Sequence, residues 1–142
     1  MQPIAISNWK RFFSTGALPE LEACLAEEVI FESPVVHTPQ VGKAITVKYL
    51  YSGQRVFHNP SFVYVREWTA SNSCVLELQT VIGGISINGV DIISWNDDNK
   101  ITSFKVMIRP LKAIQLVHQL MMQELLKHTP QSGKPEDDVR GS

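Results

Sequence analysis

The chain has 142 residues, a usual length for one domain, and 44% of them are hydrophobic, which is enough to bury a core. Its formal net charge of −1 excludes the strongly basic character of a nucleic-acid-binding or membrane-surface protein. No apolar run approaches the roughly 20 residues of a membrane span, and we expect no secretory signal. Cys24 and Cys74 belong to no paired motif, so we expect two reduced, buried thiols in a cytoplasmic protein.

The first 30 residues carry apolar side chains at helical spacing. A helix is predicted over 3–15, with a stripe made of Ile6, Trp9, Phe12 and Phe13, and Gly16 ends it. A second helix is predicted to begin near Pro19, because proline lacks an N–H group that the first helical turn does not need. The apolar stripe of this second helix is Leu21, Cys24, Leu25 and Val29.

The segment 29–43, VIFESPVVHTPQVGK, indicates a short strand that runs into a loop. Residues 29–33 alternate as a strand does, and Pro34 ends the pattern. A third helix is predicted after Gly42, and its apolar side would carry Ala44, Val47, Leu50 and Tyr51.

Beyond Asn59-Pro60 the apolar pattern changes from helical spacing to alternation. Four strands are predicted, over 61–69, 73–82, 85–95 and 101–109, and their short connections are typical of an antiparallel meander. A last helix is predicted over 111–127. The final residues, 129–142, have no apolar period, and we expect them to be a disordered tail.

Helices, then a curved antiparallel sheet, then a terminal helix make an α+β fold with the helices on one side of the sheet. We expect residues 1–128 to form a single domain, because neither an internal repeat nor a linker interrupts them. Long strands that close over helices can enclose an apolar cavity.

Asp91 lies in a strand whose same face is otherwise apolar. Alternation along 85–95 places Asp91 with Ile87, Ile93 and Trp95. A carboxyl on such a face must find a cation, find donors, or keep its proton with a raised pKa. A protonated carboxyl can donate a hydrogen bond to a ligand, whereas a structural role would pair Asp91 with Arg109 or tie it into a turn beside Gly89. Both interpretations stay open here.

His37 is the second candidate for catalysis, because imidazole exchanges protons near neutral pH. It lies in a proline-bounded loop, and a solvated histidine without a chemical role is the alternative. Ser33 lacks the G-x-S-x-G context of a nucleophile. The other histidines, His58, His118 and His128, have no metal-binding spacing, and no phosphate-cradling glycine loop is present. We therefore expect neither a metal nor a cofactor.

Two stretches carry a resemblance to a known family, F-E-S-P-V-V-H-T-P-Q-V-G at 31–42 and G-V-D-I-I-S-W-N-D-D-N-K-I-T-S-F at 89–104. With the helical start, they resemble the ketosteroid isomerase and SnoaL-like branch of the nuclear-transport-factor-like superfamily. The first is similar to the isomerase pattern V-E-D-P with a later glycine, and the second to I-D-H-x-R-F-x-x-x-G-K-V. The resemblance covers roughly residues 3–110. It implies a cystatin-like cone around a hydrophobic pocket, often in a homodimer packed through the sheet.

The resemblance carries over one catalytic role and loses two. The oxyanion-hole aspartate of the isomerases falls on Asp91. Their general-base aspartate falls on Ser33, whose hydroxyl does not accept a proton at neutral pH as a carboxylate does. Their oxyanion-hole tyrosine falls near Trp9, whose indole N–H donates a hydrogen bond without being an acid. Steroid isomerisation by the family mechanism is therefore not expected, unless His37 replaces the lost base from the adjoining loop.

Three functions remain open. The first is a SnoaL-like isomerase or cyclase that acts on a hydrophobic carbonyl compound, with Asp91 as hydrogen-bond or proton donor and His37 assisting. The second is a non-catalytic module that holds a small apolar molecule. The third is a dimeric interaction protein with a filled cone. The first two predict a ligand pocket lined by Trp9, Phe13, Ser33, Tyr51 and Trp95.

Overall fold

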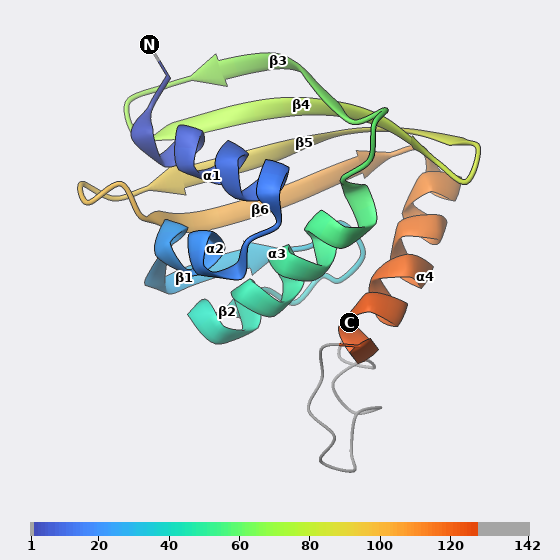
Figure 1. Ribbon diagram of the computed structural model, residues 1–142, viewed down its shortest axis with the longest axis horizontal. Coiled ribbons are helices and arrows are strands. Elements are labelled where there is room, and N and C mark those ends of the chain that lie inside the picture. Colours follow the sequence, from blue (N-terminus) through green and yellow to red (C-terminus); the bar gives the residue numbers. More distant parts are fainter. Residues whose placement is uncertain (1, 128–142) are drawn as a thin grey trace.

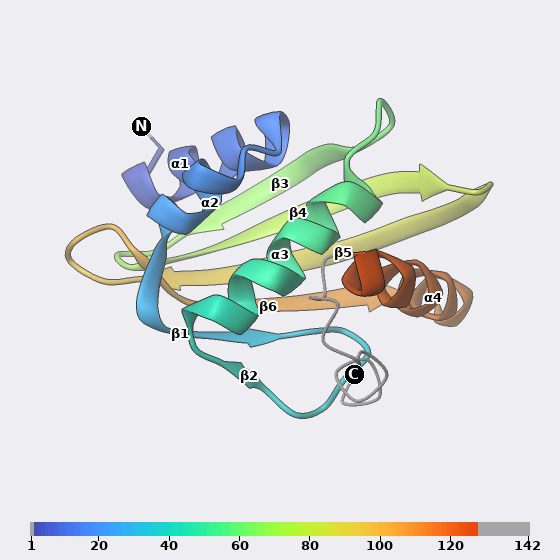
Figure 2. The same ribbon diagram turned by 60° about the horizontal axis from the view of Figure 1, so that its bottom comes forward.

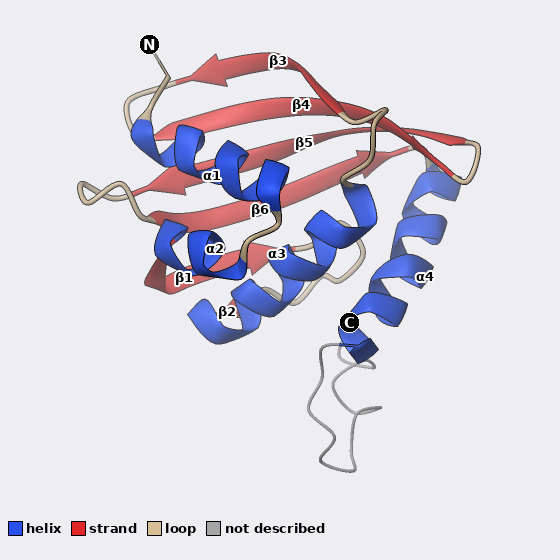
Figure 3. Ribbon diagram, in the orientation of Figure 1, coloured by secondary structure: helices blue, strands red, loops and turns tan. Residues whose placement is uncertain are grey.

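Four helices and six strands make up the part of the chain that the computed structural model describes, residues 2–127. The predicted tail, 129–142, lies outside the described residues. In chain order the elements are α1 (Ile4–Thr15), α2 (Leu18–Cys24), β1 (Leu25–Glu32), β2 (Gln40–Val41), α3 (Lys43–Phe57), β3 (Val63–Thr69), β4 (Ser73–Ile82), β5 (Ile85–Trp95), β6 (Ile101–Arg109) and α4 (Leu111–Lys127). Figure 3 shows how helices and strands divide the molecule.

The strands form one sheet in the order β2-β1-β6-β5-β4-β3. Strands β3 to β6 are the predicted antiparallel meander, because each pairs with the next along the chain. β1 pairs in parallel with β6, with Phe31 opposite Phe104, so the sheet is mixed. β2 then pairs antiparallel with β1 at the edge. The pairings within the meander thus join strands that follow one another in the sequence, whereas the pairing of β1 with β6 joins strands far apart in the sequence.

Helices α1, α2 and α3 lie across one face of the sheet, and α4 returns beside α3 at one end (Figures 1 and 2). The main core sits between these layers. Ile6 and Phe12 of α1 are fully buried against inward residues of the sheet, such as Leu76 and Ile93. Burial of such large apolar side chains, at about 1.5–3 kcal/mol each, is what holds the helices on the sheet.

The predicted second helix is wrong beyond Cys24, where β1 begins. Leu25 has extended backbone angles and pairs with Ile101 of β6, and Val29 is buried in the same strand. The pairing with β6 shifts register between Leu25 and Ile30. This irregularity breaks the alternation of buried and exposed residues, and the remaining apolar spacing imitates a helix.

The helix predicted after Gly42 exists as α3, but its buried side differs from the predicted one. Leu50 is buried as expected, whereas Ala44 is exposed and Tyr51 only half-buried. The buried line follows Thr46, Tyr49, Leu50 and Gln54 instead. The prediction followed apolar residues only. The buried side of α3 also carries polar residues, such as Thr46 and Gln54, so the apolar residues alone did not mark it.

The structure also describes the two cysteines, the length of the helices and the grouping of possible metal ligands. Cys24 and Cys74 are free and buried, as predicted. Within residues 2–127, none of the helices is long and apolar enough to cross a membrane. The same residues contain no cluster of three His, Cys, Asp or Glu side chains that could hold a metal ion.

Candidate functional site

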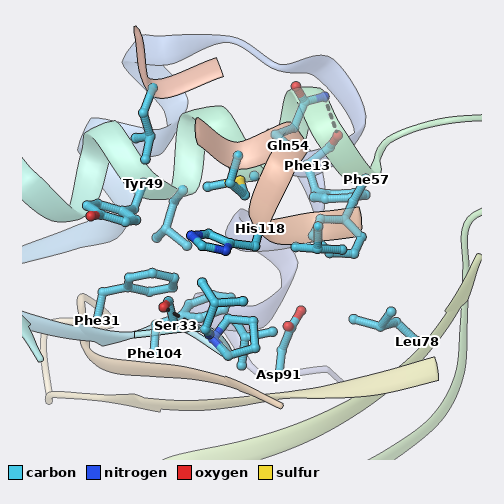
Figure 4. Close-up of a pocket in the computed structure, with 18 of the residues that line it drawn as sticks. Phe13, Phe31, Ser33, Tyr49, Gln54, Phe57, Leu78, Asp91, Phe104 and His118 are labelled. Atoms are coloured by element: carbon cyan, nitrogen blue, oxygen red, sulfur yellow. Dashed lines mark hydrogen bonds between the residues drawn. The ribbon is translucent and has the colours of Figure 1, made fainter. Parts of the chain in front are cut away.

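A pocket lies between the inner face of the sheet and helices α1, α3 and α4 (Figure 4). Aromatic and aliphatic side chains form most of its wall, among them Phe13 of α1, Phe57 of α3 and Phe104 of β6. The loop after β1 closes one side with residues 33–35, and α4 closes another. The wall is thus assembled from segments that span most of the described chain.

The pocket is open rather than filled by side chains. Its cavity volume is about 70 Å³. One water molecule needs a cavity of about 10–15 Å³, whereas a cavity that holds benzene has about 150 Å³. The enclosed part is therefore small, and a ligand larger than one ring must extend through the mouth or displace side chains.

Asp91 provides the buried carboxyl of this pocket. It is 5% exposed and lies on the inner face of β5 with Ile87, Gly89, Ile93 and Trp95, as alternation predicts. The proposed structural partner, Arg109, is not bound to it. Arg109 donates to Asn88 Oδ1 at 3.4 Å, and the register of β5 and β6 pairs these two residues, which places them on the opposite face.

Asp91 is instead bound by a chain of two donors. The Tyr64 hydroxyl of β3 donates to Asp91 Oδ2 at 2.6 Å, and Trp9 Nε1 of α1 donates to the Tyr64 hydroxyl at 3.0 Å. The indole donor orients the phenol so that its own proton points to the carboxyl. Among the described residues, Tyr64 is the only hydrogen-bond donor to Asp91, so Oδ1 is left for a ligand in the pocket.

Burial affects the pKa values of both Asp91 and Tyr64 in this hydrogen-bonded group. It raises the pKa of Asp91 from 3.8 to about 7, although the hydrogen bond from Tyr64 acts in the opposite direction. The pKa of Tyr64 is raised well above 10, first by its own burial and then by the neighbouring Asp91 carboxyl. Tyr64 therefore keeps its proton, and Asp91 exchanges its proton near neutral pH.

The other polar groups of the pocket are mostly engaged with the backbone. The Ser33 hydroxyl accepts hydrogen bonds from the N–H groups of Val35 at 3.3 Å and Val36 at 3.0 Å. Gln54 Nε2 donates to the Phe13 carbonyl at 2.9 Å. Ser33 thus shapes the loop that follows β1, and its hydroxyl proton can still donate to a ligand.

The structure brings together four of the residues predicted for the site and separates three others from them. Trp9, Phe13, Ser33 and Asp91 all line the pocket. Tyr51 lies outside the lining, where its ring stacks with the Arg55 guanidinium at 5.7 Å. Trp95 is buried in the core beyond the pocket. His37 is exposed and borders a shallow surface hollow behind the loop, so it does not face Asp91.

Among the residues that the sequence did not assign to the site, Tyr64 and His118 matter most for its chemistry. Tyr64 lies on the inner side of β3, opposite Leu78 of β4. Its direction toward the pocket follows from this pairing register, which the sequence does not reveal. His118 lies one residue after Val117 on the side of α4 that lines the pocket. Its helical spacing to Met121 and Met122 was visible in the sequence, but that stripe is equally typical of a core.

Solved structures supply the comparison with known proteins, because no family model and no curated protein matches the chain. A steroid delta-isomerase from Pseudomonas aeruginosa is similar, with 28% identity, a TM-score of 0.81, and 87% of this chain and 90% of that chain covered. So is a bacterial protein with a cystatin-like fold from Silicibacter pomeroyi, with 24% identity, a TM-score of 0.81, and 98% and 94% covered. These similarities show that the chain has the nuclear-transport-factor-like fold.

The fold expected from the two quoted stretches is thereby confirmed. An NTF2-like protein from Mesorhizobium loti shares the fold alone, with 16% identity, a TM-score of 0.64, and 75% of this chain and 88% of that chain covered. The fold is shared by a protein with an isomerase name and by a protein of unknown function, so the fold alone does not assign the chemistry.

Proposed function

We propose that this protein binds a small, largely apolar molecule in the pocket and acts on it as an isomerase or cyclase. The observation that carries the proposal is the Asp91 carboxyl, buried at the floor of an apolar pocket with one oxygen unbound by the described residues. A buried carboxyl with a pKa of about 7 can donate a proton or a hydrogen bond at neutral pH.

The polar atom of the ligand that fits this floor is a carbonyl oxygen. Protonated Asp91 donates to that oxygen, and the donor strengthens as negative charge develops there in an enolate-like transition state. Trp9 and Tyr64 hold the carboxyl in place, so little reorganisation is needed when the charge forms. Similarity to a steroid delta-isomerase supports the same class of chemistry.

The apolar wall selects the rest of the ligand. Phe13, Phe57 and Phe104 offer ring faces and edges to a flat hydrophobic body. The enclosed volume of about 70 Å³ takes only the reacting end of such a molecule, so the remainder must displace side chains, for instance on the α4 side. Met121 and Met122 line that side, and methionine adapts its shape to different ligands.

A binding module without turnover is the second candidate function. It is favoured by Ser33, which occupies the position of the isomerase base and accepts two backbone hydrogen bonds. A pocket in which no base reaches the ligand would hold a carbonyl compound without moving a carbon-bound proton. The two candidates differ in turnover and not in binding.

A ligand panel tests binding first. We expect at least one of the classes steroids, aromatic polyketides, terpenoids and fatty acids to raise the melting temperature at fixed protein concentration, because a ligand of the folded state stabilises it by mass action. The bound compound should then be turned over by the wild type and about 10²–10⁴-fold more slowly by Asp91→Asn. A panel without any shift would refute the ligand pocket. A shift without turnover would leave the binding module as the function.

The homodimer that the family resemblance implies is part of the proposal. The helices cover one face of the sheet, and the opposite face carries Trp68, Val75 and Ile92 in neighbouring strands. We expect a mass of about 32 kDa by sedimentation, twice the 16.0 kDa of one chain. Ile92→Glu should yield a monomer, because it buries an unpaired charge in that contact. A wild-type monomer at all concentrations would contradict the expectation.

A further inference from the structure

His118 places an imidazole on the wall of the pocket that Asp91 also lines. Helix α4 turns Val117, His118, Met121, Met122 and Leu125 toward the same hollow that Asp91 lines. Figure 4 shows the imidazole pointing into the hollow from the helix side, while the Asp91 carboxyl points into it from the sheet. The two side chains therefore lie on opposite walls of the pocket.

Helix α4 holds His118 in this place. Val117 is 1% exposed and Leu125 is 3% exposed, so the helix is packed tightly on both sides of the histidine. Val117 also packs with Ile87, Ile108 and Ala113 in a second apolar cluster at this end of the sheet. His118 itself is exposed at the mouth, where its imidazole can exchange protons with solvent between turnovers.

Few other groups of the pocket can move a proton near neutral pH. The titratable side chains that line the pocket with His118 are Tyr49 of α3 and Asp91 of β5. Phenols ordinarily hold their proton until high pH, so histidine is the residue type suited to the base role. Within residues 2–127 no carboxylate other than Asp91 lines the pocket, and Ser33 does not act as a base at neutral pH.

We propose that His118 is the catalytic base of this pocket and works together with Asp91 on a ketone that has an acidic carbon–hydrogen bond. This inference rests on the proposed function, because it needs a carbonyl ligand at Asp91. It differs from the earlier expectation for His37, which lies outside the pocket.

The step balances with these two groups alone. The neutral His118 imidazole takes the proton from the carbon between the carbonyl and the double bond of a β,γ-unsaturated ketone. The electron pair of that C–H bond forms a new carbon–carbon double bond, and the carbonyl oxygen takes the hydrogen bond or proton of Asp91. The imidazolium then returns the proton to the γ-carbon, and the oxygen gives its proton back to Asp91. The product is the conjugated ketone.

The test follows conversion of a β,γ-unsaturated cyclohexenone and of a Δ5-3-ketosteroid to their conjugated isomers by ultraviolet absorbance. We expect His118→Gln to lower kcat by about 10²–10⁴-fold with little change in KM. Free imidazole should restore activity to His118→Ala, which a purely structural role would not predict. Gln119→Ala, an exposed neighbour on the same helix, is the matched control.

The outcomes separate this inference from the function on which it rests. If the wild type converts neither ketone, both are overturned. If Asp91→Asn is slow and His118→Gln is as fast as the wild type, the function stands and the role of His118 is overturned. Loss of activity in His37→Gln with full activity in His118→Gln would assign the base to His37 and overturn the inference. Circular dichroism checks that each variant is folded.

Discussion

Asp91→Asn is expected to remove most of the pH dependence of the unfolding free energy between about pH 4 and pH 8. The Asp91 carboxyl is almost fully buried, and its pKa rises from 3.8 to about 7 on folding because burial disfavours the charged form. An asparagine of nearly the same shape can accept the hydrogen bond from Tyr64 but cannot ionise.

The sign follows from where each state binds the proton. Below about pH 4 the carboxyl is protonated in the folded and the unfolded chain, and its contribution is fully present. As the pH rises to about 7, the unfolded chain loses the proton first and the folded chain keeps it, so stability falls. The difference between 3.8 and about 7 corresponds to about 4 kcal/mol, lost by the wild type and not by the variant.

Urea unfolding at a series of pH values measures this effect. Tyr64→Phe is the second arm, because it removes the hydrogen bond that lowers the Asp91 pKa and leaves Trp9 Nε1 without its acceptor. We expect Tyr64→Phe to cost about 1–3 kcal/mol and to shift the loss of stability to higher pH. Parallel curves for the wild type and Asp91→Asn would show that Asp91 is not the titrating group.

Gly89→Ala is expected to lower the unfolding free energy by about 3 kcal/mol, at the upper end of what overpacking costs. A Cβ at Gly89 would clash with the Met107 carbonyl oxygen and would lie 3.2 Å from Ile108 Cγ1. The first contact is with backbone of the neighbouring strand β6, which no rotamer change can relieve. The strands must therefore separate locally, two residues from Asp91 on the same face of β5.

Gly53→Ala is the matched control for this substitution. Nothing lies within 4 Å of a Cβ at Gly53, which is in the interior of helix α3. Alanine there should stabilise the protein by about 0.5–1 kcal/mol through helix propensity. Chemical unfolding measures both variants under the same conditions. Equal stability of Gly89→Ala and the wild type would contradict the close approach of β5 and β6.

The candidate site was only partly predictable, and the reason differs from residue to residue. Asp91 was placed correctly because alternation along a regular strand decides which face a side chain occupies. Its partner Tyr64 is 27 residues away in the sequence, and Trp9 is a further 55 residues from Tyr64. No local pattern predicts that these three groups meet. Pairing with Arg109 or a turn beside Gly89 was therefore the structural role considered for Asp91.

The fold shows the same division. Helices α1 and α4 and the strands of the meander have strong local periodicity, and all of them were predicted with errors of a few residues at the ends. The start of β1 was missed because its register shift hides the alternation. The buried side of α3 was missed because Thr46 and Gln54 interrupt the apolar stripe.

The sequence by itself determined most of the elements, the α+β class, the inward direction of Asp91 and the resemblance to the superfamily, because local periodicity and short motifs are readable without a structure. The tertiary structure decided which of these elements meet. Parallel pairing of β1 with β6 and the return of α4 beside α3 bring Ser33, Asp91 and His118 to one pocket. The free energy of such contacts comes from residues far apart in the chain, so the site exists only once the sheet and helices have packed.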